Sequence, residues 1–222
     1  MAEKKKPKIK KRNTTFEKKL SVSSRRYLER QAADPYVAKA KAQGYRSRAV
    51  FKLEEIDRKY SLLKPGQTIV DLGAAPGGWS QYAARKLSGK CTVLALDKLE
   101  ISPIAGVTIL MGDFTTDECE AELAALCPNK VDVVLSDMAP ETTGLSKVDH
   151  LRAMGLAELA ADFAIKHLKP GGVFLCKLFM GGEEKPFADG LRQYFDKVKF
   201  EKPESSRAES REVFLLATGF KG

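Results

Sequence analysis

The sequence predicts an α/β fold in which a mostly parallel, doubly wound β-sheet is covered by helices on both faces. From residue 65 onward, short and almost wholly apolar runs alternate with helix-like stretches, a pattern typical of strands buried on both faces. The last two runs are separated by only a short loop. Strands joined so closely pair antiparallel, because parallel neighbours need a longer crossover. We therefore expect a parallel sheet that ends in an antiparallel strand.

Each element of this fold has its own sequence signal. Apolar residues recur at helical spacing between residues 25 and 60, and Gly44 divides this stretch into two helices. The sequence Lys64-Pro65-Gly66 is typical of a turn and marks the change to alternating strands and helices. The expected strands are residues 68–73, 91–97, 107–113, 131–137, 172–179, 197–203 and 211–220.

Positive charge is concentrated at the N-terminal end of the chain, whose formal net charge is +9. Residues 1–30 hold 12 Lys/Arg and 3 Asp/Glu, whereas residues 65–222 hold 18 and 22. This asymmetry favours a polyanionic partner, most simply nucleic acid, bound with salt-sensitive affinity. We predict a disordered basic arm at 1–20, a helical nucleic-acid-binding segment at 21–64 and a catalytic domain at 65–222. A solubilising tail is the alternative for the arm.

Composition disfavours several classes of protein. No apolar run reaches the roughly 20 residues of a membrane-spanning helix. The basic N-terminus leads into no apolar segment of a secretory signal, so we expect a cytoplasmic protein that does not bind membranes. The 4 cysteines form no CxxC pair and the only histidines are His150 and His167, so we expect no metal site. A monomer is expected.

A glycine-rich turn lies between the first strand and the next helix, in IVDLGAAPGGWSQYAA. In open α/β sheets, ligands bind at this place, outside the carboxyl ends of the strands. Gly73, Gly77 and Gly78 leave no Cβ between the backbone and a ligand. Where a dinucleotide fingerprint would have glycine, the chain has Ala75 followed by Pro76. This difference disfavours a pyrophosphate-binding loop, and with it a nicotinamide-dependent oxidoreductase.

Carboxylates stand at the ends of successive expected strands. Asp97 ends the second strand, where a carboxylate accepts hydrogen bonds from ribose hydroxyls. Asp113 ends the third strand, within reach of an adenine edge. Acids in this arrangement fit a nucleoside that carries no phosphate to repel them. The alternative is that Asp71, Asp97 and Asp113 only cap the helices that follow.

Several longer blocks make the chain similar to a known family. The sequences RSRAVFKLEEI, DLGAAPGGWSQY, SDMAP and PESSRAESREVFLLATG resemble the FtsJ-type (RrmJ/RlmE) ribosomal RNA large-subunit ribose 2′-O-methyltransferases. The resemblance runs from about residue 21 to the C-terminus. It implies a Rossmann-like class I methyltransferase fold, a seven-stranded sheet with an antiparallel last strand, and S-adenosyl-L-methionine as cofactor. It also implies a cofactor site lined by Gly77, Trp79, Asp97, Asp113 and Asp137.

The reaction of that family depends on a Lys-Asp-Lys-Glu tetrad, and the matching motifs put it on Lys52, Asp137, Lys177 and Glu212. Such groups have a physical role, because a sulfonium leaving group needs no help and the enzyme must mainly align the acceptor oxygen and remove its proton. A lysine acts as a base only in its neutral form. We hypothesise that Lys177 is the base and Lys52 helps to position the substrate, while the two carboxylates orient the ammonium groups. A solvated surface charge is the alternative for Lys52.

The loop after the fourth strand, SDMAPETTG, bears on the substrate. It has no cysteine for a cytosine-carbon methyltransferase and no [ND]PP[YF]-like motif of an exocyclic-amine methyltransferase. With the resemblance, this favours 2′-O-methylation of a uridine ribose in large-subunit (23S) ribosomal RNA on the assembled 50S subunit, which would be the partner. Two alternatives stay open: ribose methylation of a tRNA anticodon loop, and a catalytically inactive RNA-binding ribosome-assembly factor.

Overall fold

The computed structural model describes residues 33–141 and 143–222 of the chain. Residues Pro35–Gly222 form one compact unit. The predicted arm at 1–20, and the first part of the predicted nucleic-acid-binding segment, lie outside the described residues. From Pro35 onward that segment belongs to the same compact unit as the sheet, and its role in binding nucleic acid stays a prediction.

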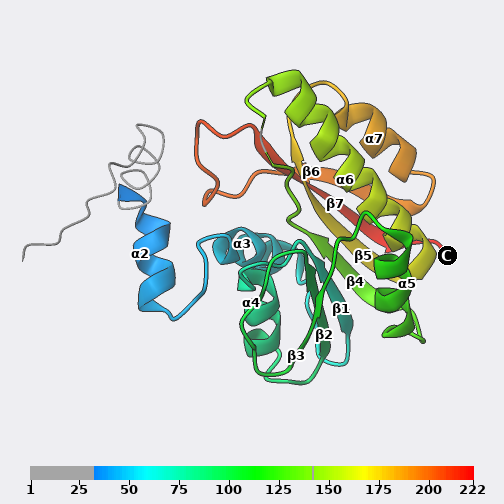
Figure 1. Ribbon diagram of the computed structural model, residues 1–222. Helices are drawn as coiled ribbons and strands as arrows, with labels where there is room; N and C mark the ends of the chain where they lie inside the picture. The colour runs from blue at the N-terminus through cyan, green and yellow to red at the C-terminus, as the bar shows by residue number, and fades with distance from the viewer. Residues whose placement is uncertain (1–32, 142) are drawn as a thin grey trace, which may run out of the picture. The chain divides into compact units, whose positions relative to one another are not determined.

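Seven strands of the described residues form one sheet in the order β3-β2-β1-β4-β5-β7-β6 (Figure 1). Neighbouring strands from β3 to β5 pair parallel, and β7 pairs antiparallel with both β5 and β6. The predicted doubly wound sheet with an antiparallel last strand is therefore confirmed. The strand bounds are β1 (Thr68–Leu72), β2 (Thr92–Asp97), β3 (Val107–Met111), β4 (Val131–Ser136), β5 (Leu168–Phe179), β6 (Phe195–Glu201) and β7 (Glu212–Phe220).

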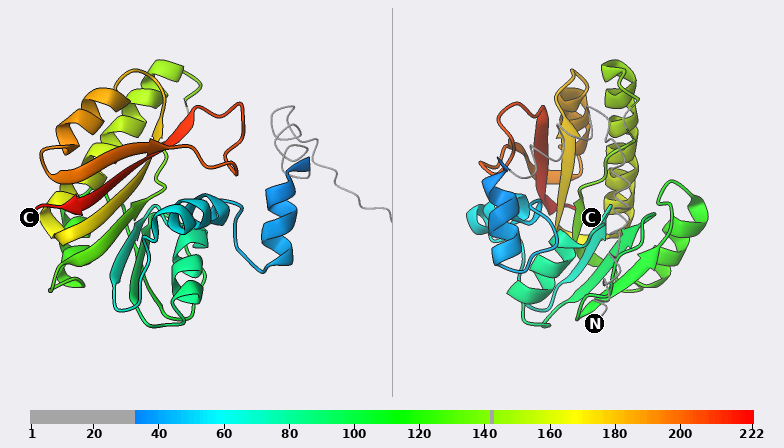
Figure 2. Two further views of the ribbon diagram at one scale, coloured as in Figure 1. Left: turned by 180° about the vertical axis from the view of Figure 1, so that it is seen from behind. Right: turned by 60° about the vertical axis from the view of Figure 1, so that its left-hand side comes forward.

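Helices cover both faces of this sheet, and the right-hand view of Figure 2 shows α4 and α6 on opposite sides of it. Successive residues of a strand point to opposite faces, so they belong to different cores. Val133 and Leu135 of β4 pack with residues of α3 and α4, whereas Val134 packs with α6. One face carries α2 (Pro35–Ala42), α3 (Val50–Tyr60) and α4 (Gly78–Lys86), and the other α5 (Asp117–Ala125), α6 (Ser146–His167) and α7 (Glu184–Leu191).

The two helices expected before the first strand are present as α2 and α3, and Gly44 lies between them with a φ of 66°. A residue with a side chain is strained at that φ, so glycine suits the end of α2. Val50, Leu53 and Ile56 follow the helical spacing seen in the sequence and are all buried against the sheet. The segment before the sheet is thus an integral part of the hydrophobic core.

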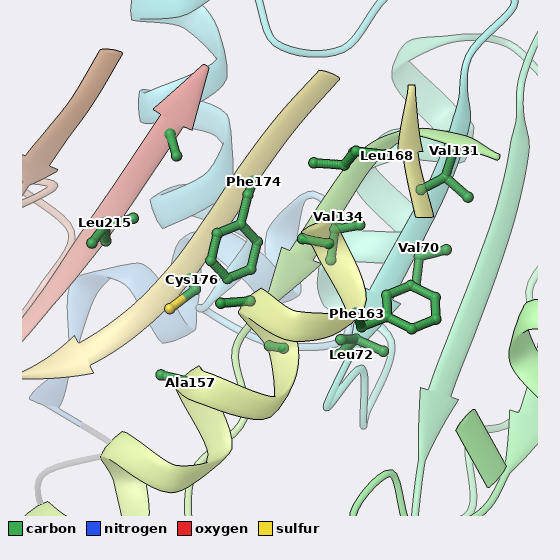
Figure 3. Close-up of a cluster of buried hydrophobic side chains, with 14 of the residues drawn as sticks. Val70, Leu72, Val131, Val134, Ala157, Phe163, Leu168, Phe174, Cys176 and Leu215 are labelled. Carbon is green, nitrogen blue, oxygen red and sulfur yellow. The ribbon is translucent and has the colours of Figure 1, made fainter. Parts of the chain in front are cut away.

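The largest hydrophobic core lies under α6. Figure 3 shows Phe163 of this helix beside Val70 and Leu72 of β1. Phe163 is fully buried, and its ring meets Phe114 edge to face with 5.6 Å between centroids. Interiors of this kind are packed as densely as organic crystals, so removal of a large side chain here leaves a cavity.

Phe163→Ala is expected to lower the free energy of unfolding by about 3–5 kcal/mol, because it removes a buried ring and leaves a cavity. Leu151 of the same helix is 54% exposed and provides the control. Leu151→Ala is expected to change the free energy by less than about 0.5 kcal/mol. Urea unfolding measures both, and equal losses would contradict the packing described for α6.

A carboxyl group lies in the middle of the sheet. Asp71 of β1 pairs in register with Ala95 and Leu135 and is 0% exposed. Its Oδ2 accepts a hydrogen bond from Ser80 Oγ at 2.6 Å, and its Oδ1 has no hydrogen-bond partner among the residues that the structure describes. The pKa of Asp71 is raised to about 7, mainly by burial; the Ser80 hydrogen bond opposes this rise and the charge of Asp137 adds to it.

This raised pKa predicts a specific dependence of stability on pH. The pKa in the folded state, about 7, lies above the ordinary 3.8, so the folded state retains a proton that the unfolded state releases. The protonated Asp71 therefore contributes to the free energy of unfolding. This contribution is fully present below about pH 4 and is lost as pH rises to about 7, at up to about 1.4 kcal/mol per pH unit. Asp71→Asn is expected to remove this loss.

Urea unfolding at pH 5 and pH 8 tests the prediction. The stability of Asp71→Asn relative to the wild type is expected to rise between the two values. Asp189→Asn changes an exposed carboxyl and serves as the control, with little such change. A constant difference between Asp71→Asn and the wild type would show that the carboxyl does not titrate in this range.

Candidate active site

The carboxyl ends of the parallel strands enclose a cavity of about 810 Å³. Gly73 follows β1, Asp97 ends β2, Asp113 follows β3 and Asp137 follows β4, and all four line it. The side of the cavity is closed by α6 residues that include Leu156. Its place is that of ligands in open α/β sheets, and its size is that of a small-molecule site.

Two of the aspartates in this cavity are held in fixed orientations. Asp97 accepts hydrogen bonds from the backbone N–H groups of Ala75 and Leu99, each at 2.8 Å. Asp113 Oδ1 accepts from the backbone N–H of Thr115 at 3.0 Å and from its hydroxyl at 2.7 Å. These bonds keep the pKa of Asp113 below its ordinary value. Four carboxylates, but also Lys98 and Arg152, line the cavity, so acids outnumber bases there and a neutral or cationic nucleoside suits it better than a pyrophosphate.

Two other residues expected at the cofactor are not among those that line this cavity. Trp79 is 2% exposed, its ring packs on Phe214 with 5.8 Å between centroids, and its Nε1 donates to the backbone oxygen of Ala49 at 2.8 Å. Gly77 precedes α4 with a φ of 99°. Contacts of both residues with a cofactor stay predictions.

Two glycines of the turn have no room for a side chain. A Cβ on Gly73 would lie 2.6 Å from Met138 Cγ and 2.8 Å from Met138 Cα, in the loop after β4. A Cβ on Gly77 would lie 2.6 Å from Ile104 Cδ1. Close approach to a ligand was the reason expected from the sequence. The structure adds that neighbouring loops already pack against the turn.

Arg46 connects this turn to the segment before α3. Its guanidinium donates to the backbone oxygens of Ser102 and Pro103, each at 2.6 Å, and of Pro76 at 3.2 Å. Its backbone N–H donates to Gln81 Oε1 at 3.1 Å. Arg46 thus fixes the glycine turn against the loop after β2. Sequence reasoning missed it, because backbone acceptors leave no mark in a sequence.

The four predicted tetrad residues form two lysine–carboxylate pairs. Lys52 Nζ donates to Glu212 Oε2 at 2.7 Å, and both side chains are about nine-tenths buried. Lys177 Nζ lies 2.9 Å from Asp137 Oδ1 and donates to the backbone oxygen of Asp137 at 2.7 Å. Ser206 Oγ donates to the other oxygen of Glu212 at 2.9 Å. Each ammonium group is therefore held by a carboxylate away from most solvent.

Strand register places Lys177 and Glu212 on the same face of the sheet, near the carboxyl end of β5. Lys177 of β5 stands opposite Phe214 of β7, and Phe179 stands opposite Glu212. Residues opposite each other across antiparallel strands point to the same face, as do alternate residues of one strand. Phe214 packs in the core that α3 covers, and Lys52 reaches Glu212 from that helix.

Asp137 belongs to both parts of the candidate site. It lines the cavity, and its carboxylate contacts Lys177. A molecule in the cavity would therefore contact the Lys177–Asp137 pair at Asp137. Within residues 33–141 and 143–222, no three His, Cys, Asp or Glu side chains are grouped to hold a metal ion, and no helix is long and apolar enough to cross a membrane.

Comparisons with known proteins show which family the chain is similar to. The FtsJ-like methyltransferase family model matches residues 45–220. A protein of Acidiphilium cryptum named ribosomal RNA large subunit methyltransferase E is 53% identical over 199 residues, 90% of this chain and 88% of the relative. A protein of the same name from Maricaulis maris is 50% identical over 200 residues, 90% of this chain and 71% of the relative.

A solved structure from Plasmodium falciparum, titled as a ribosomal RNA methyltransferase, has a TM-score of 0.73 and 30% identity to the chain. The match covers 80% of this chain and 100% of that one. The family model spans most of the chain and the relatives align over nine-tenths of it. The chain therefore belongs to the FtsJ-like methyltransferase family.

Proposed function

We propose that the protein transfers a methyl group from S-adenosyl-L-methionine to the ribose 2′-hydroxyl of a uridine in large-subunit ribosomal RNA, with the assembled subunit as substrate. The observation that carries the proposal is the position of Asp137, which lines the cavity and contacts Lys177. The substrate class is supported by the names of the relatives, which are ribosomal RNA large subunit methyltransferases.

The cavity fits the proposed cofactor. When bound, S-adenosyl-L-methionine supplies a methyl group activated by a sulfonium cation. The carboxylate of Asp97 would hold the ribose hydroxyls, and Asp113 would stand at the adenine edge. The excess of acids over bases around the cavity favours a cationic ligand that carries no phosphate.

The two pairs have distinct roles in this proposal. Lys177, after its ammonium has released a proton to solvent, takes the proton of the 2′-hydroxyl at Nζ as the hydroxyl oxygen gains the methyl group. Asp137 orients Lys177 toward the cavity through their contact. Lys52, fixed by Glu212, positions the acceptor ribose from the side of α3. The ribose oxygen is a weak nucleophile, so its alignment is a large part of the rate enhancement.

A methyl-transfer assay tests the proposed function. Radiolabelled S-adenosyl-L-methionine is offered with large ribosomal subunits from cells that lack the gene, with naked large-subunit RNA and with tRNA, and the product nucleoside is identified by mass. We expect 2′-O-methyluridine in the subunit RNA. Label in tRNA alone would contradict the substrate, and no label in any RNA would favour a ribosome-assembly factor without catalysis.

Lys177→Met is expected to lower kcat by about 100- to 10,000-fold, because it removes the proton acceptor. The affinity for S-adenosyl-L-methionine is expected to stay within about twofold, since Lys177 does not line the cavity. Lys166→Met removes a more exposed lysine that pairs with Glu120 and provides the control, with unchanged kcat. Near-normal kcat in folded Lys177→Met would refute the assignment of the base.

Arg46→Ala is expected to weaken S-adenosyl-L-methionine binding by about 10-fold or more, because it removes three hydrogen bonds that fix the loops beside the cavity. Arg46→Lys is expected to restore only part of the affinity, because one ammonium cannot reproduce the fork. Calorimetry measures the affinity, and kcat at saturating cofactor is expected to change much less.

Arg85 provides the matched control. Its guanidinium donates to the backbone oxygens of Gln43 and Gly44 and does not contact the glycine turn. Arg85→Ala is expected to leave the cofactor affinity within about twofold. Equal losses in Arg46→Ala and Arg85→Ala would mean that Arg46 acts only through general stability.

A further inference from the structure

A second cavity, of about 400 Å³, lies at the other end of the parallel strands. Gln67 before β1, Asp132 near the start of β4 and Gly172 early in β5 line it, so it opens at the amino ends of the parallel strands. Asp132 in β4 lines this cavity and Asp137, just after β4, lines the larger one; five residues of extended backbone separate them by about 17 Å.

Three lysines line this second cavity: Lys64, Lys197 and Lys199. Lys197 and Lys199 are alternate residues of β6 and stand opposite Thr218 and Leu216 of β7, so they point to one face of the sheet. Lys64 comes from the loop between α3 and β1. Among residues 33–141 and 143–222, no carboxylate lies within ion-pair distance of these three ammonium groups.

The carboxylates near these lysines already have other partners. Asp132 Oδ2 accepts from Lys169 Nζ at 2.9 Å and from the backbone N–H of Thr68 at 2.8 Å. Glu201 accepts from Lys59 Nζ at 2.8 Å and from the hydroxyl of Tyr60. The cavity therefore keeps an excess of positive charge, although residues 65–222 as a whole carry more acids than bases.

We propose that this lysine cavity binds the phosphate backbone of the substrate RNA at nucleotides distant from the methylated one. The proposal rests on the proposed function, which supplies RNA as the ligand. Phosphate fits a group of lysines that have no carboxylate partner, and backbone contacts position a nucleic acid without reading its sequence. Lys199 also lies 5.7 Å from the centroid of the Tyr60 ring, a contact that leaves its N–H groups available to a phosphate. Because this cavity and the proposed catalytic residues lie at opposite ends of the strands, the contact would serve RNA affinity and orientation rather than methyl transfer.

The edge position of β6 provides another explanation for two of the lysines. Lysines on an edge strand discourage pairing with a second sheet. This explanation does not extend to Lys64, which lies outside the strand and lines the same cavity. Edge protection predicts that a variant without the β6 lysines aggregates, whereas an RNA contact predicts that it binds RNA more weakly.

The test compares two triple variants of the full chain. One is Lys64→Gln/Lys197→Gln/Lys199→Gln, and the control is Lys90→Gln/Lys166→Gln/Lys185→Gln, which makes the same change in net charge at exposed lysines outside the cavity. Filter binding to naked large-subunit RNA is measured from 50 to 200 mM salt. Methylation of large subunits gives kcat and KM.

The cavity variant is expected to bind RNA at least about 10-fold more weakly than the control at low salt. Its slope of log affinity against log salt is expected to be smaller by up to about 2, as for three lost phosphate contacts at about 0.7 each. KM for RNA is expected to rise while kcat and cofactor affinity stay within about twofold, since a contact equal in ground and transition states affects only binding.

Equal affinity in the two variants would overturn the proposal. So would aggregation of the cavity variant with normal RNA affinity, which would assign the lysines to edge protection. If the wild type binds ribosomal RNA but methylates none, the proposed function fails, and the binding comparison still decides the role of the cavity.

Discussion

The contact between Lys177 and Asp137 is the interaction on which the candidate site depends. It exists because β4 and β5 run parallel in register, so that the residue after β4 meets a side chain near the end of β5. The side chain of Lys177 is 8% exposed, and a charge so nearly buried is tolerated only when it is paired. Asp137 supplies both its carboxylate and its backbone oxygen, and it also faces the cavity.

The antiparallel strand β7 completes the site from the other side. A seventh strand inserted between β5 and β6 brings Glu212 to the same face and edge as Lys177. Helix α3, which precedes the sheet in sequence, supplies Lys52 from above that face. Residues up to 160 positions apart therefore meet because the strand order differs from the chain order. The balance of charge differs between the two ends of the strands: acids outnumber bases around the larger cavity, and lysines outnumber acids around the smaller one.

Continuous apolar runs were sufficient to predict the five parallel strands, because buried parallel strands are nearly continuous hydrophobic runs. The mostly exposed β6 was predicted at 197–203 and lies at Phe195–Glu201. β5 begins at Leu168, whereas the predicted strand began at residue 172. The prediction began too late because Pro170 and the two glycines after it are typical of a turn. The tetrad was available only through the resemblance. Arg46 binds backbone oxygens, and the lysine cavity joins segments far apart in sequence. Neither feature has a local pattern, so only the fold reveals them.

A double-mutant cycle on kcat tests the central claim that Lys177 and Asp137 act as one unit. Asp137→Asn, Lys177→Met and the double variant are compared with the wild type by methyl transfer to the same RNA at saturating cofactor. The account predicts strong non-additivity, with the double variant no more than about 10-fold slower than the slower single variant, because either change already disables the pair. Multiplicative losses would show that the two residues act independently and would contradict the account.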